Sequence, residues 1–119
     1  MFEVSSLSLL FNNTMQTIQL KKFGTVLVSR PAGLEAFRAL RPTLDASQQV
    51  AIDFDGVLTV TPSWFDEFLT NLAEYFAGKV ELLPTENASV RAMLPVLAQE
   101  RNDAAAGTLQ RAIDAMHLL

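Results

Sequence analysis

Hydrophobic and polar residues follow a two-residue period in several short runs, and these runs predict β-strands. Residues 17–22 (TIQLKK) and 24–29 (GTVLVS) alternate around a Phe-Gly pair, which predicts a short hairpin with one buried face. Residues 49–54 (QVAIDF) form a compact β-rich run before an Asp-Gly turn and predict a central buried strand. A further short strand is predicted at residues 79–83 (KVELL).

A helical period appears between these strands. Apolar residues recur at helical spacing from residue 31 to about residue 44, which predicts the first helix. The clearest helix is predicted over residues 62–77, because one face is apolar and the other polar. Asn87 or Ser89 caps a third predicted helix, and a final helix is predicted after Asn102. The apolar face of the second helix consists of Phe65, Phe68, Leu69, Leu72 and Phe76.

The order of these elements predicts one α/β domain with helices packed against a sheet. The 119 residues fit a single domain, and 50% apolar with 18% charged residues is a globular composition. Residues 15–119 are expected to form this domain. Residues 1–14 are expected to be either an N-terminal extension or an extra edge strand.

Charge and cysteine content exclude several functional classes. The net charge of −4 without a basic run argues against nucleic-acid partners and anionic membrane surfaces. The absence of cysteine excludes disulfides and cysteine-based zinc sites. The first thirteen residues lack the charged start of a signal peptide, and no apolar run is long enough to span a bilayer. A cytoplasmic protein without cofactor or metal is therefore expected.

One short motif suggests catalysis. Residues 52–59 (IDFDGVLT) match the first motif of the haloacid-dehalogenase-like phosphatases. In that resemblance Asp53 would attack a phosphoryl group, Asp55 would act as acid and base, and both would hold a magnesium ion. The later parts of that pattern are missing, since Lys79 is the only lysine after the motif and no late acidic pair follows. A magnesium-dependent phosphatase is thus the alternative function. We prefer Asp53 as a buried carboxylate that hydrogen-bonds the following turn, and Asp55 as a turn residue.

A longer stretch, residues 22–100, resembles the STAS-like domains of unknown function, which are relatives of the anti-sigma factor antagonists. The resemblance lies in Ser29-Arg30 with Gly33, in residues 50–57 (VAIDFDGV), and in residues 60–69 (VTPSWFDEFL). It implies a four- to five-stranded mixed sheet with helices packed against it. It also implies a non-enzymatic, bacterial-type regulatory module that acts by binding another protein.

In antagonists of this kind, a serine at the start of the helix after the central strand is phosphorylated by a histidine-kinase-like ATPase. The matching position here is Ser63, so the resemblance implies a switch at Ser63 and, as partner, such an ATPase or a sigma-type regulator. The neighbours Thr61, Pro62 and Trp64 depart from the antagonist pattern, which puts regulated phosphorylation in doubt. A third hypothesis is a homodimer formed through the last helix.

The residues around Ser63 can also be interpreted chemically. A phosphate in the first turn of a helix is stabilised by free backbone N–H groups, and Asp66 and Glu67 would add to its negative charge. Ser63 and Asp66 also have the spacing of a capping pair, so Ser63 is a cap, a switch, or both. Arg30 is either a phosphate partner or solvated. One of Trp64 and Phe65 is expected to be exposed; Trp64 is either an exposed interface anchor or, as we prefer, a core or inter-helix contact. The predicted docking surface comprises Asp55, Thr61, Ser63, Trp64, Asp66 and Glu67.

The only histidine of the sequence, His117, offers no base for a catalytic serine.

Overall fold

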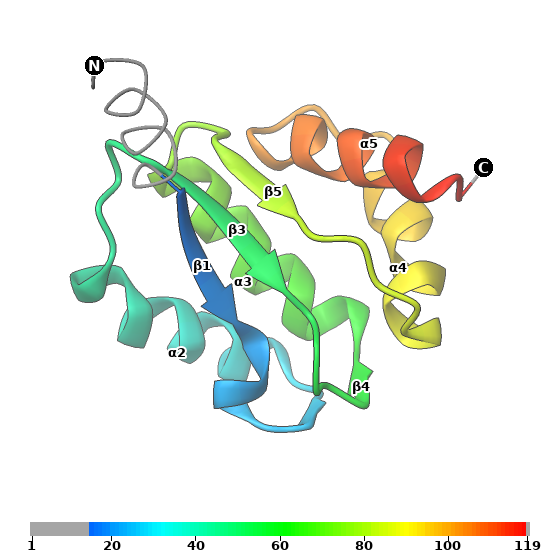
Figure 1. Ribbon diagram of the computed structural model, residues 1–119, viewed down its shortest axis with the longest axis horizontal. Helices are drawn as coiled ribbons and strands as arrows, with labels where there is room; N and C mark the ends of the chain where they lie inside the picture. Colours follow the sequence, from blue (N-terminus) through cyan, green and yellow to red (C-terminus); the bar gives the residue numbers. More distant parts are fainter. Residues whose placement is uncertain (1–14, 119) are drawn as a thin grey trace, which may run out of the picture.

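The computed structural model describes residues 15–118, so the predicted extension or edge strand at residues 1–14 lies outside the described residues. Strands alternate with helices along the described chain (Figure 1). The elements are β1 (Met15–Gln19), the 3-10 helix η1 (Leu20–Phe23), β2 (Val26–Leu27), α2 (Arg30–Leu40), the 3-10 helix η2 (Arg41–Thr43), β3 (Gln49–Asp53), β4 (Thr59–Val60), α3 (Pro62–Tyr75), β5 (Val80–Leu82), α4 (Ala88–Ala98) and α5 (Ala105–Met116).

The strands form two separate parallel sheets. β3 lies between β1 and β5, as predicted for the central strand, with Ile18 opposite Ile52 and Ile52 opposite Leu82. β2 pairs only with β4 in a two-stranded sheet, where Leu27 lies opposite Val60. The α/β architecture is confirmed, but the larger sheet has three strands, fewer than the predicted four to five, and all described strand pairs are parallel rather than mixed.

The predicted hairpin between the first two strands is wrong. β1 pairs with β3, whereas β2 pairs with β4. Between them the chain turns through η1, which buries Leu20 completely, and Gly24 adopts a positive φ of 124° that favours glycine. Because this turn directs β2 away from β1, the two strands do not pair with each other, and each pairs with a strand that is distant in sequence.

The main core lies between the larger sheet and the helices behind it in Figure 1. The predicted apolar face of α3 is confirmed, since all five of its predicted residues are fully buried. On the sheet, Ile18, Val50 and Ile52 are also buried, and so is Ala51 between the last two, so the central strand β3 is covered on both faces. The order of strands and helices in residues 15–118 therefore agrees with the order of the strand-like and helix-like apolar runs in the sequence.

The outer edge of β5 is covered by α5, which lies beside it in Figure 1. Thr108 is buried, and its hydroxyl donates to the carbonyl oxygen of Val80 at 2.7 Å. Arg111 Nη2 donates to the same oxygen at 3.1 Å and pairs with Glu81 Oε2 at 2.8 Å. Side chains of α5 thus satisfy a backbone group that an edge strand would otherwise present for pairing with another chain.

None of the helices between residues 15 and 118 combines the length and the apolar character that crossing a membrane requires.

Replacing Gly33 in α2 with alanine is expected to lower the free energy of unfolding by about 1–3 kcal/mol. The added Cβ would lie 2.3 Å from the backbone oxygen of Trp64, so α2 and α3 would have to move apart. A decrease in the free energy of unfolding would be informative, because alanine within a helix normally stabilises it by about 1 kcal/mol relative to glycine. The control is Gly107→Ala in α5, whose Cβ would meet the flexible end of Arg111. Urea unfolding that gives the same change for both variants would contradict this close contact.

Candidate functional site

Helix α3 begins at the Thr61–Pro62 step. The Thr61 hydroxyl oxygen accepts a hydrogen bond from the amide of Trp64 at 3.3 Å, and the hydroxyl donates to the carbonyl of Val28 at 2.9 Å. Thr61 is therefore the N-cap, and the predicted capping role of Ser63 is wrong, because Pro62 takes the first helical position and the cap precedes it. Ser63 is the second helical residue, and its side chain is exposed.

The two aromatic residues that follow are both buried, so the expectation that one of them is exposed is wrong, whereas the preferred core position of Trp64 is confirmed. Trp64 is 1% exposed and Phe65 is 0% exposed. Trp64 stacks on Phe68 at a centroid distance of 4.9 Å and also contacts Phe23 of η1, whereas Phe65 packs against Phe54 at 5.5 Å. The two rings share Phe68 as a neighbour but otherwise pack against different residues, Phe23 and Phe54, so the core holds both. Trp64 is thus not available to a partner in this conformation.

The acidic residues one turn further along α3 are paired within the molecule. Arg30 Nη1 contacts Asp66 Oδ2 at 2.8 Å and Glu67 Oε1 at 3.2 Å. Arg101, from the connection between α4 and α5, contacts the other oxygen, Asp66 Oδ1, at 2.7 Å. Arg30 therefore reaches the first turns of α3, where it pairs with carboxylates rather than being only solvated, and its role as a phosphate partner stays a prediction. The two arginines compensate most of the negative charge that the sequence places at this surface.

Two opposing effects set the pKa of Asp66. Partial burial acts to raise the pKa, but the hydrogen bonds from Arg30 and Arg101 outweigh it, so the pKa of Asp66 lies below its usual value. The charged form of the carboxylate is consequently favoured in the folded protein. The ion pairs persist at neutral pH and weaken only in acid.

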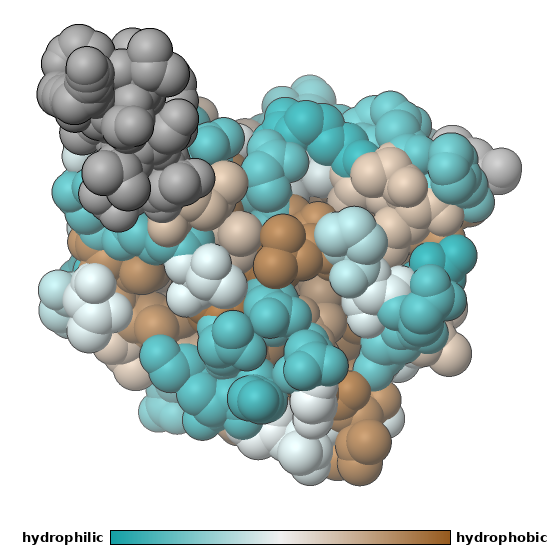
Figure 2. Space-filling model, viewed as in Figure 1, coloured by the Kyte–Doolittle hydropathy of each residue, from teal (hydrophilic) through white to brown (hydrophobic). Residues whose placement is uncertain are grey.

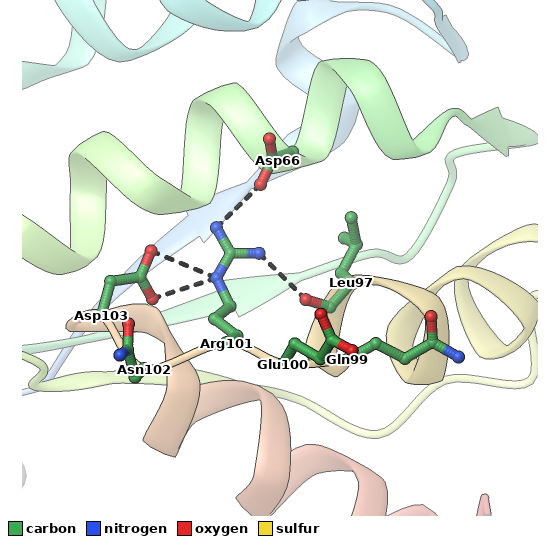
Figure 3. A pocket seen from close by; sticks show the side chains of 7 residues that line it. All are labelled: Asp66, Leu97, Gln99, Glu100, Arg101, Asn102 and Asp103. Carbon is green, nitrogen blue, oxygen red and sulfur yellow. Dashed lines mark hydrogen bonds and ion pairs between the residues drawn. The ribbon is translucent and has the colours of Figure 1, made fainter.

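Arg101 is a site residue that the sequence did not reveal. Its Nη2 also donates to Thr70 Oγ1 at 2.6 Å, and its Nε pairs with Asp103 Oδ1 at 3.0 Å. Figure 3 shows the arginine between Asp66 and Asp103, at a depression of about 300 Å³ beside α3. A single arginine after a helix end has no sequence pattern that would distinguish it from a solvated one.

The Asp53–Asp55 motif forms a turn at the carboxyl end of β3. Asp53 Oδ1 accepts a hydrogen bond from the amide of Asp55 at 2.9 Å, which is the role preferred for it from the sequence, although Asp53 is half-buried rather than buried. Lys79 lies at the other end of the strand, where its Nζ donates to the carbonyl of Ser47 at 3.2 Å. Among residues 15–118, no three His, Cys, Asp or Glu side chains gather as a metal would require. This geometry lends no support to the phosphatase alternative.

The described surface next to the start of α3 carries exposed apolar side chains that the sequence analysis did not assign to the site. Val26, Val28 and Leu58 are 57%, 54% and 70% exposed, and we call these three residues the β2–β4 rim. Figure 2 shows hydrophobic residues on the surface below β4. The rim is tied to α3 through Thr61, whose hydroxyl bonds to Val28. The signal was present in the uninterrupted apolar run at residues 26–28, since a strand buried on one face hides only every second residue.

Asp66→Asn is expected to make stability less dependent on pH. Since the folded pKa of Asp66 is lowered, its carboxylate contributes stability above the usual pKa near 4, and this contribution is lost as pH falls through the folded value. Urea unfolding between about pH 5 and pH 2 should show a larger loss of stability in the wild type, by less than about 1 kcal/mol because solvent still reaches the carboxylate and screens its ion pairs. Equal losses in both proteins would contradict the pairing.

Comparison with known proteins gives a match to one family model, which covers residues 36–81. No curated protein and no solved structure matches the chain. The matching segment runs from the second half of α2 to β5, and it includes the Asp53–Asp55 turn and the start of α3. It confirms the predicted resemblance to STAS-like domains over this segment. Residues 36–81 match a family model that is described as a STAS-like domain of unknown function.

Proposed function

We propose that this chain is a non-enzymatic regulatory domain that binds another protein through the start of α3 and the β2–β4 rim. The match to a STAS-like domain supports a regulatory role. The β2–β4 rim is the observation that carries the proposal, because three exposed apolar side chains occur in or next to the paired strands β2 and β4, and the Val28 carbonyl is bonded to Thr61 at the start of α3. Contiguous apolar residues on a soluble surface are typical of sites where another protein binds.

Burial of the β2–β4 rim would contribute much of the binding free energy. Complete burial of a valine or leucine side chain is worth about 1.5–3 kcal/mol, and the three rim residues are each more than half exposed. Asp55 and Thr59, which are close to Leu58 in sequence, and Ser63 at the start of α3 are exposed and would form the outer part of the interface. We therefore expect a partner with an apolar contact surface.

The charges at the start of α3 make Ser63 a suitable position for a switch. Asp66 and Glu67 are compensated by Arg30 and Arg101, so the unmodified surface has little net charge there. A phosphate on Ser63 would add a charge of about −1.5 to −2 three residues before Asp66. A partner that fits the unmodified apolar surface would then have to bury that charge, which disfavours binding. The resemblance suggests a histidine-kinase-like ATPase as the enzyme that adds the phosphate.

Leu58→Asp is expected to reduce partner capture from extracts of the native cell by at least about tenfold, because it places a charge in the apolar contact. Val96→Asp is the matched control, since Val96 on α4 is 56% exposed and lies outside the β2–β4 rim. Quantitative mass spectrometry of proteins retained on each immobilised variant gives the comparison. If the two variants retained the same proteins in the same amounts, the rim would not be the docking surface.

Incubation of the wild type with magnesium and a generic phosphomonoester is expected to give no turnover above the buffer control. The reason is that Lys79 lies beside the start of β3, at the opposite end of that strand from Asp53, and bonds to Ser47, so it does not compensate phosphoryl charge. Phosphate release is the measurement, with Asp53→Asn as the control. Turnover in the wild type that disappears in Asp53→Asn would contradict the non-enzymatic role.

A further inference from the structure

The connection between α4 and α5 has one anchoring side chain. Of residues 99–103, four have exposed side chains, and only Arg101 is turned inward, with 13% of its side chain exposed. Figure 3 shows its guanidinium pointing from the connection toward α3. The position of this segment on the molecule therefore depends mainly on one residue.

Arg101 uses every nitrogen of its guanidinium for contacts. Nη2 bonds to Asp66 and Thr70 on α3 at 2.7 and 2.6 Å. Nη1 donates to the carbonyl of Leu97 at 3.1 Å, and Nε bonds to Asp103. One side chain thus joins the end of α4, the start of α5 and the first turns of α3. Charge-assisted hydrogen bonds of this kind are stronger than neutral ones.

The backbone of the connection contributes little to holding it in place. The bonds from Gln99 N to Val96 O and from Arg101 N to Ala98 O are long, at 3.4 and 3.3 Å. Glu100 has a φ of 52°, in the left-handed region that residues other than glycine rarely adopt. A strained residue in an exposed loop needs a compensating contact, and here the adjacent Arg101 supplies it.

The contact that Arg101 makes on α3 belongs to the proposed docking surface. Asp66 divides its two oxygens between Arg30 and Arg101, so any group that draws Asp66 away weakens the hold on the connection. We propose that residues 99–103 form a latch, which the Arg101–Asp66 pair keeps closed on α3 and which opens when that pair is broken. The latch rests on the proposed function for its trigger, the engagement of Asp66 by a partner. It would carry a binding event at α3 to the α4–α5 end of the molecule.

Hydrogen exchange followed by mass spectrometry tests the latch without a partner. Arg101→Met keeps the aliphatic length and removes the charge, and Asp66→Ala removes the carboxylate that Arg101 contacts on α3 while Thr70 remains. Both variants are expected to speed exchange of the amides of residues 99–106 by roughly tenfold, the effect of losing one charge-assisted interaction, relative to the amides of β3. Arg30→Gln is the matched control, because Arg30 shares Asp66 but does not bond to the connection.

Three results would overturn the latch. The first is unchanged exchange at residues 99–106 in Arg101→Met and Asp66→Ala. The second is an equal acceleration at residues 99–106 and in β3, which would mean general loss of stability rather than local opening. The third is the same acceleration in Arg30→Gln. None of these results depends on partner capture, so failure of the latch and failure of the proposed docking surface are distinguishable.

Discussion

The close contact between α2 and α3 determines how the site is built. Gly33 allows the backbone oxygen of Trp64 to approach so near that a Cβ would lie 2.3 Å from it. At this spacing Trp64 is enclosed by Phe23 and Phe68, and Arg30 reaches Asp66. The same contact thus buries Trp64 and brings Arg30 to the acidic residues that follow Ser63 on α3. The exposed apolar side chains of the site are then those of the β2–β4 rim.

Local periodicity explains which parts of the fold could be predicted. The helices and the central strand carry their own signals, because a helical or strand period is visible within a few residues. Strand pairing is different, since β1 and β2 alternate as hairpin strands do but pair in parallel with partners far along the chain. β4 has only two residues, Thr59–Val60, too few to show a period. Parallel pairing is set by the crossover helices and not by the strands alone.

The site was predicted in position but not in detail. The start of α3 and Ser63 lie where the sequence placed them, whereas the cap is Thr61 and the Trp64 side chain is buried. Both differences arise from tertiary neighbours: Val28 fixes Thr61, and Phe23 covers Trp64. Arg101 lies 35 residues from Asp66 in sequence, so their pairing depends on the packing of α4 and α5 against α3.

In the proposed function, the domain binds its partner through the β2–β4 rim and the polar start of α3. The effect of binding would then reach the connection between α4 and α5 through the ion pairs that Asp66 shares with Arg30 and Arg101. The most direct measurement is in-cell photo-crosslinking from a photoreactive residue that replaces either Leu58 or Val96, which are both exposed apolar positions. The account predicts a crosslinked protein from position 58 that is absent from position 96. No crosslinked protein at position 58, or the same proteins at both positions, would contradict it.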